Sequence, residues 1–220
     1  MLRIIARGSE NVASTRKRFE DDIEMLRLGI TAAARTGGER VISFLGQCPG
    51  VGTTTLAVWL ARSLARESRR TLLADGNFVN PRVHELFQTD PEPGAVELLE
   101  GRAEADEVVR PTSDPKLSVL PCGRCEAPTI STSVEQWRSQ WRDLASDRFL
   151  LIDAGSADSP SALTMADASD GVILVVKCGD VSREQIESIQ KRMSLSGTQL
   201  LGVILNQRRY VIPEVIYRRL

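Results

Sequence analysis

The sequence predicts an α/β protein with a doubly wound, mostly parallel β-sheet and helices on both faces. Three observations support this prediction: short apolar runs recur along the chain, segments of helical period lie between them, and the runs are apolar on both faces. Strands that are covered on both faces need a crossover helix between parallel neighbours. The predicted strands are 41–45, 71–75, 117–121, 149–153, 172–177 and 200–205.

Capping signals mark two of the helices between these strands. Ser133 and Gln136 form a capping box ahead of one helical pattern. Ser182 and Gln185 form a second capping box ahead of another. Trp137 and Trp141 are four residues apart and therefore share a helix face. We expect both indoles in the core rather than in a binding site.

The 220 residues are suited to one globular domain. We predict an N-terminal arm over residues 1–20 and a single domain over 21–220. A helical pattern places Ile23, Leu26 and Ile30 on one face near the start of that domain.

Composition excludes several functions. A net charge of -1 gives no basic field for nucleic acid, so we expect no such partner. No apolar run approaches the roughly 18 residues of a membrane span, and four cysteines are too few for a disulfide framework, which predicts a cytoplasmic protein. Cys122 and Cys125 have the spacing of a zinc half-site or redox pair, but with a single histidine in the chain an ordinary loop is favoured.

A glycine-rich turn follows the strand predicted at 41–45 and precedes an apolar helix. In that position Gly50 and Gly52 let backbone N–H groups converge on an anion, and the helix N-terminus adds partial positive charge. The pattern predicts a phosphate loop for ATP or ADP, with Thr54 placed to bind Mg²⁺. The predicted nucleotide contacts within the loop are Gly50, Val51, Gly52, Thr53, Thr54 and Thr55.

The loop departs from the consensus G-x-x-x-x-G-K-[ST] at two positions. Thr53 stands where the lysine belongs, and Gln47 where the first glycine belongs. Loss of the charged phosphate contact weakens nucleotide binding by about 2–3 kcal/mol. The alternative interpretation is a turn that only lets the helix pack close to the strand.

Four stretches together resemble a known family. They are 49-PGVGTTT-55, 71-TLLADGNFVNPRVHELF-87, 149-FLLIDAGSADSPSALTMADASDGVILVV-176 and 200-LLGVILN-206. They are similar to the cytoplasmic catalytic domain of bacterial polysaccharide-biosynthesis tyrosine kinases, which belongs with the ParA/MinD-type P-loop ATPases. The resemblance implies a P-loop NTPase-like fold with a degenerate Walker A motif.

The resemblance also implies roles for residues at three strand ends. Asp75 and Asp153 match the catalytic and Mg²⁺-site aspartates, with Thr54 as a further metal ligand. Asn206 matches an asparagine that faces the adenine in relatives. The second carboxylate of the family's D-x-D-x-R pattern is replaced by Asn77.

The arginine of that pattern is replaced by Val79. Together with the lysine replaced by Thr53 and the carboxylate replaced by Asn77, the site lacks three charged side chains. We therefore predict a degenerate kinase-like protein of exopolysaccharide or capsule biosynthesis or export, with weak or no ATP turnover. The resemblance implies a partner, the cytoplasmic segment of a transmembrane chain-length regulator, which would hold the chain at the inner membrane. Two alternatives stay open: an active protein tyrosine autokinase, and a MinD-like positioning ATPase.

Two family features are altered as well. Tyr210 and Tyr217 are the only tyrosines, so the tail has no tyrosine cluster. The family's oligomerisation pattern E-x-x-R-x-x-R falls on Asp21, Glu24 and Arg27, with its middle charge inverted. A homo-oligomer therefore stays an open expectation.

Overall fold

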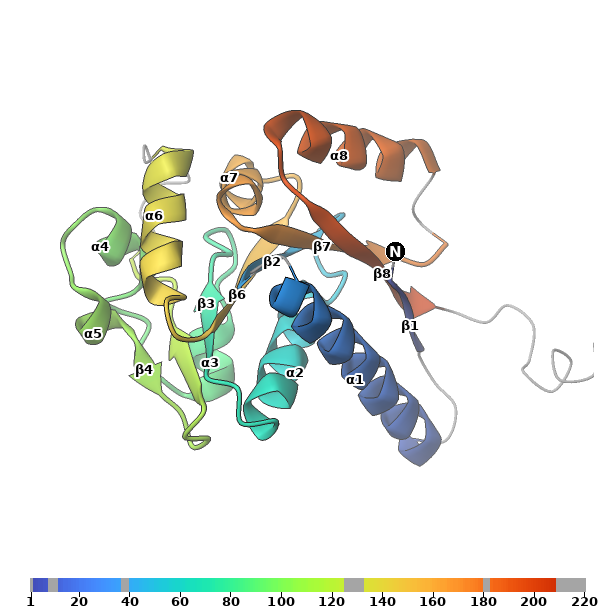
Figure 1. Cartoon of the computed structure of the whole chain (residues 1–220), viewed down its shortest axis with the longest axis horizontal. Helices are drawn as coiled ribbons and strands as arrows, with labels where there is room; N and C mark the ends of the chain where they lie inside the picture. Colours follow the sequence, from blue (N-terminus) through green and yellow to red (C-terminus); the bar gives the residue numbers. More distant parts are fainter. Residues whose placement is uncertain (1, 8–11, 37–39, 125–132, 180–182, 209–220) are drawn as a thin grey trace, which may run out of the picture.

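A computed structural model of the chain describes residues 2–7, 12–36, 40–124, 133–179 and 183–208. Strands and helices alternate through most of these residues (Figure 1). In chain order they are β1 Leu2–Arg7, α1 Val12–Thr36, β2 Val41–Gly46, α2 Thr53–Arg66, β3 Thr71–Asp75, α3 Val83–Phe87, α4 Ala95–Leu99, α5 Ala105–Val108, β4 Arg110–Pro111, β5 Leu117–Leu120, α6 Val134–Leu144, β6 Phe149–Ser156, α7 Pro160–Ala168, β7 Gly171–Lys177, α8 Arg183–Ser196 and β8 Leu200–Arg208.

The strands form one sheet in the order β1-β8-β7-β2-β6-β3-β5-β4. Every neighbouring pair is parallel except β4 and β5, which are antiparallel. The predicted α/β class and the six predicted strands are confirmed. Because the central strands are parallel, their carboxyl ends meet at one edge, where ligands bind in sheets of this kind.

Helices cover both faces of the sheet (Figure 1). On one face α1 and α2 pack against a cluster that includes Ile42, Phe44 and Val175. On the other face α4, α6 and α7 pack against a second cluster that includes Leu45 and Ile152. Adjacent strand residues thus point into opposite cores, which explains why the strands are apolar without alternation.

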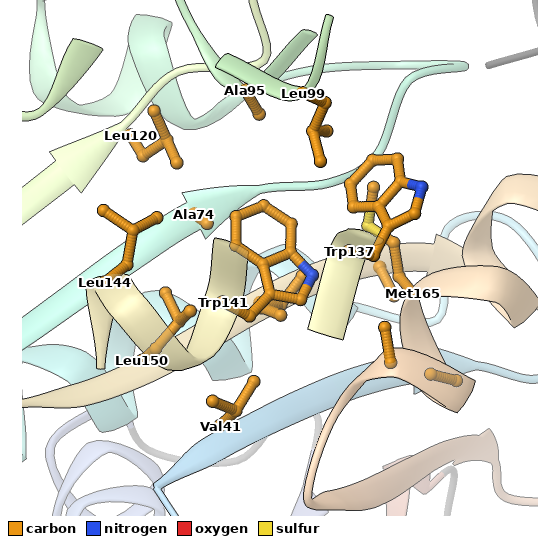
Figure 2. Packing of buried hydrophobic residues seen from close by; sticks show 14 of the residues in the cluster. Val41, Ala74, Ala95, Leu99, Leu120, Trp137, Trp141, Leu144, Leu150 and Met165 are labelled. Atoms are coloured by element: carbon orange, nitrogen blue, oxygen red, sulfur yellow. The ribbon is translucent and has the colours of Figure 1, made fainter. Parts of the chain in front are cut away.

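Helix α6 begins at the predicted capping box, with the Ser133 hydroxyl accepting the Gln136 N–H at 3.3 Å. Trp137 and Trp141 are 1% and 0% exposed, and their rings lie 5.4 Å apart. Figure 2 shows the two indoles among aliphatic side chains from the strands and from α7. The expectation that both tryptophans belong to the core is confirmed.

The N-terminal segment joins the sheet. Strand β1 pairs parallel with β8, and α1 continues across residue 20, where we placed the end of an arm. The division into an arm over 1–20 and a domain over 21–220 stays a prediction. Ile23, Leu26 and Ile30 are buried on one face of α1, as the pattern predicted.

Some predicted features lie outside the described residues, namely Ser182 of the second capping box, Cys125, and both tyrosines. Cys122 is buried in the core beside α4. No helix in the described parts of the chain is both long enough and apolar enough to span a membrane.

Candidate nucleotide-binding site

The glycine-rich loop joins β2 to α2 at the carboxyl edge of the sheet. Gly50 and Gly52 have φ angles of 76° and 93°, in a region that residues with a side chain rarely adopt. A Cβ on Gly52 would lie 2.5 Å from the amide nitrogen of Asn206. Both glycines are therefore required by the path of the loop, which supports its interpretation as a phosphate loop.

The end of β8 holds this loop in place. The Asn206 side-chain amide donates to the Val51 carbonyl at 2.7 Å, and the Gln207 amide donates to the Gly50 carbonyl at 2.6 Å. Val51 itself is buried among apolar residues of α1 and α2. Both loop carbonyls are thus satisfied by side chains of β8, which support the backbone of the loop.

Asn206 was predicted from the resemblance to contact the nucleotide, and this role stays a prediction. The structure shows a further role for Asn206, because its side-chain amide donates to the Val51 carbonyl of the loop. Gln207 was not predicted as a site residue. A glutamine near the end of β8 gives no local signal of this contact, which depends on that end of β8 lying beside the loop.

We expect Asn206→Ala to loosen the loop. The Val51 carbonyl would lose its donor, which typically costs about 1–3 kcal/mol when the group stays buried. Urea denaturation should therefore show a lower free energy of unfolding. Gln190→Ala, an exposed change in α8, is the matched control. Unchanged stability and unchanged nucleotide affinity in Asn206→Ala would contradict a supporting role.

Thr54 and Asp153 meet at the base of the loop. Thr54 lies in the first turn of α2, and its hydroxyl donates to the carboxylate of Asp153 near the end of β6. The other carboxylate oxygen of Asp153 accepts the Gly155 N–H at 3.3 Å. A hydroxyl and a carboxylate side by side are hard oxygen ligands of the kind Mg²⁺ prefers, so this pair fits the predicted ion.

Asp75 lies next to Asp153 in the sheet. The two residues are register partners on the adjacent strands β3 and β6. One Asp75 oxygen accepts the N–H groups of Arg82 and Val83, both at 2.8 Å, and the other accepts that of Asn77 at 3.2 Å. Asp75 therefore holds the loop after β3 and the start of α3 in place.

The structure thus brings Thr54, Asp75 and Asp153 together at the carboxyl edge. Burial raises the pKa of Asp75 to about 7, with a further contribution from the charge of Asp153, against three backbone hydrogen bonds that lower it. Burial raises the pKa of Asp153 to about 6, opposed by hydrogen bonds from Thr54 and Gly155. Two adjacent buried carboxylates resist double ionisation, so a cation at this place is favoured.

A cavity of about 590 Å³ lies next to this pair: Thr54 and Gly155, which are bonded to Asp153, line it, while Asp75 and Asp153 themselves are buried. Its walls come from the loop, from the turn after β3, and from the segment between β6 and α7. The lining includes Cys48, Gly50, Gly52, Thr53, Thr54, Thr55, Asn77, Val79, Arg82, Gly155, Ser156 and Pro160. The volume is that of an ordinary small-molecule site.

The three positions that lack family charges all line this cavity. Thr53 is 7% exposed and packs on Gly46. A Cβ added to Gly46 would lie 2.6 Å from the Thr53 hydroxyl. Asn77 accepts the Asn80 N–H at 3.1 Å, and Val79 is 69% exposed. The three positions at which the resemblance implies missing charges therefore line one cavity.

Among the described residues that line the cavity, the single basic side chain is Arg82. Its guanidinium is already paired with Glu85, at 2.6 Å. Since both side chains of that ion pair are exposed, the pair is weak. Arg82 was not predicted, because its approach depends on the fold of the turn after β3.

A parallel sheet, a glycine-rich loop between β2 and α2, and two carboxylates at adjacent strand ends together define the P-loop NTPase fold. The same fold is found in the kinase domain of Escherichia coli tyrosine kinase ETK, which is 18% identical with a TM-score of 0.79 and covers 88% of this chain and 78% of that one. MinD of Pyrococcus horikoshii, in a complex with Mg-ADP, has the same fold with a TM-score of 0.68. It is 22% identical, and the match covers 81% of this chain and 76% of MinD.

Sequence comparison gives the same assignment. Tyrosine-protein kinase YwqD of Bacillus subtilis is 27% identical over 191 residues, which are 84% of this chain and 79% of that protein. Tyrosine-protein kinase ptk of Acinetobacter johnsonii is 28% identical over 92% of this chain, but over 29% of its own length. The homologues of this chain are bacterial tyrosine-protein kinases, a family related to capsule and exopolysaccharide. No family model matches the sequence.

Proposed function

We propose that the chain is a degenerate tyrosine-kinase-like protein that binds ATP or ADP with Mg²⁺ but turns ATP over weakly or not at all. One observation carries this proposal. The glycine turn has positive φ angles at Gly50 and Gly52 and Thr54 contacts Asp153, while Thr53 and Val79 line the adjacent cavity where the family pattern has a lysine and an arginine.

In this proposal each part of the site has a separate task. The loop from Gly50 to Thr55 receives the phosphates through backbone N–H groups and the N-terminus of α2, and neither depends on the side chain at position 53. Thr54 and Asp153 hold Mg²⁺, with Asp75 behind them. When bound, Mg²⁺ supplies positive charge between the phosphates.

Phosphoryl transfer requires more than binding, because charge on the transferred group must be stabilised as it moves. Here the lysine, the second carboxylate and the arginine are replaced by Thr53, Asn77 and Val79. Groups that act on one transition state fail together when one is absent. We therefore place the chain among pseudokinases that regulate through nucleotide binding.

The proposed setting is exopolysaccharide or capsule biosynthesis or export. The relatives support it: one is the succinoglycan biosynthesis transport protein ExoP of Rhizobium meliloti, of which the aligned residues cover 26%. We propose that the chain binds the cytoplasmic segment of a transmembrane chain-length regulator and lies at the inner membrane through that partner.

A homo-oligomer through the pattern on α1 has weaker support. Glu24 and Arg27 pair with each other within the chain, and Arg27 is 8% exposed. A buried guanidinium with an internal carboxylate partner is less suited to contact another subunit. We therefore favour the membrane regulator as the main partner.

Self-phosphorylation tests the proposal. Incubation with ATP labelled on the γ-phosphate should leave Tyr210 and Tyr217 unmodified, because the site lacks three charges of the family pattern. Phosphopeptide mass spectrometry gives the occupancy of each tyrosine, and Asp153→Ala controls for label that arises elsewhere. Stoichiometric label on either tyrosine that disappears in Asp153→Ala would establish the active autokinase instead.

A MinD-like positioning ATPase is the second candidate, favoured by the shared fold at a TM-score of 0.68. It requires ATP-dependent dimerisation. Light scattering with Mg·ATP and with Mg·ADP separates the two functions, since the regulatory pseudokinase has the same mass with either nucleotide.

A further inference from the structure

The opposite edge of the sheet carries a second cavity, of about 450 Å³. It lies at the amino-terminal ends of β2, β3 and β6 and is closed by the end of α1. Among its lining residues are Arg40, Arg69, Arg70 and Arg148, against the single carboxylate of Asp147. The nucleotide site plays no part in this cavity.

The sheet order explains why these arginines gather. Arg40, Arg70 and Arg148 each stand one residue before a strand, β2, β3 and β6 respectively. The three strands are adjacent, in the order β2-β6-β3. The Phe149 N–H donates to the Arg70 carbonyl and the Leu150 N–H to the Arg40 carbonyl, both at 2.9 Å, which fixes the starts of the strands side by side.

The charges of the cavity are only partly balanced. Asp147 accepts from both Arg70 and Arg148, the latter at 2.8 Å. Arg40 donates to the Ser146 carbonyl at 2.9 Å, and the nearby Asp170 carboxylate is bonded to the backbone N–H groups of Arg40 and Val41.

Within the described part of the chain no ion pair or hydrogen bond is found for the exposed guanidinium of Arg69. The lining therefore has a positive excess of three, from four guanidinium groups and one carboxylate. A guanidinium presents a planar fork that matches phosphate oxygens in pairs, and its charge persists at every physiological pH. Several guanidinium groups around one cavity are therefore suited to bind an anion with more than one phosphoryl group.

We propose that this cavity binds a diphosphate-class anion, held by Arg69 together with Arg40, Arg70 and Arg148. Arg69 binds directly, while Arg70 and Arg148 share their charge between Asp147 and the ligand. Two phosphate groups close together occur in a free diphosphate and in the headgroup of a lipid such as cardiolipin, and the experiment below has one arm for each source. The inference does not depend on nucleotide binding at the other edge.

The test titrates inorganic pyrophosphate into the full chain by calorimetry at low ionic strength. Gly50→Asp places a carboxylate in the glycine-rich loop and strains the backbone there, because Gly50 has a φ of 76° although a Cβ would meet no atom within 4 Å; both effects act against phosphate binding at that site alone. We expect Gly50→Asp to bind pyrophosphate still. Adding Arg69→Gln to Gly50→Asp should weaken the pyrophosphate affinity at least tenfold. Arg142→Gln, an exposed change at the end of α6, should leave the affinity unchanged.

Vesicles containing cardiolipin, whose headgroup carries two phosphate groups, form the second arm. Cosedimentation that is lost in Arg69→Gln and kept in Arg142→Gln assigns the site to lipid headgroups, and pyrophosphate binding without cosedimentation assigns it to a free diphosphate. The inference is overturned if Gly50→Asp abolishes pyrophosphate binding, if Arg69→Gln binds as the wild type does, or if neither probe binds.

Discussion

Replacing Thr53 with lysine should tighten Mg·ATP binding far more than it raises turnover. The new ammonium group would regain a charge-assisted phosphate contact of about 2–3 kcal/mol, roughly thirty- to a hundred-and-fifty-fold in the dissociation constant. Thr53 is buried against Gly46 but also lines the cavity, so we expect the longer side chain to turn away from Gly46 and into the cavity. Turnover should stay low, because Asn77 and Val79 still lack the charges of the family pattern.

Calorimetric titration of Mg·ATP into the wild type and Thr53→Lys, with phosphate release measured on the same samples, checks this result. Thr53→Gln is the matched control, since it adds length without charge. Equal affinity in the wild type and Thr53→Lys would mean that the loop does not bind phosphate. Robust hydrolysis from the single change would contradict our account of Asn77 and Val79.

The paired carboxylates at the base of the site should make the free energy of unfolding fall as the pH rises. Burial raises the pKa values of Asp75 and Asp153 to about 7 and about 6, whereas an unfolded aspartate titrates near pH ~4. The protonated forms are favoured in the folded state. The resulting stability is complete below the unfolded pKa and is lost as the pH rises through the folded values, with a loss on the order of 3 kcal/mol between pH 5.5 and pH 8.

Urea unfolding followed by the fluorescence of Trp137 and Trp141, without Mg²⁺, measures this loss between pH 5.5 and pH 8. Asp153→Asn removes one of the two charges; its Oδ1 can still accept from Gly155, and its Nδ2 can donate to the Thr54 hydroxyl in place of accepting from it. The loss should therefore become smaller, and the part due to the burial of Asp75 should remain. Asp143→Asn, an exposed change in α6, should behave as the wild type. A stability independent of pH over this range would contradict the pairing.

The sequence was sufficient for the central strands and for the glycine-rich loop because both depend on local patterns. Runs such as 149–153 are apolar on both faces only when helices cover the sheet on both sides. Strand β1 was not predicted, since residues 2–7 lie ahead of a polar helical segment and become a strand through pairing with β8. The two-residue β4 is too short for any periodic signal.

Within the site, the sequence located strand ends but not the contacts between them. The meeting of Asp75 with Asp153 followed from parallel strand ends and is seen in their register. The use of Asp75 to hold the N–H groups of Arg82 and Val83 could not be predicted, because it depends on the path of the turn after β3. The support of Val51 by Asn206 likewise joins residues that are distant in sequence.

The central claim is that ATP binds at this site and is not turned over. Equilibrium dialysis of the chain against Mg²⁺ and radiolabelled ATP, followed by chromatography of the bound nucleotide after prolonged incubation, tests it most directly. We predict saturable binding that is abolished in Gly50→Asp, with the bound nucleotide recovered as ATP. Absence of saturable binding, or recovery of the bound nucleotide as ADP, would contradict the account.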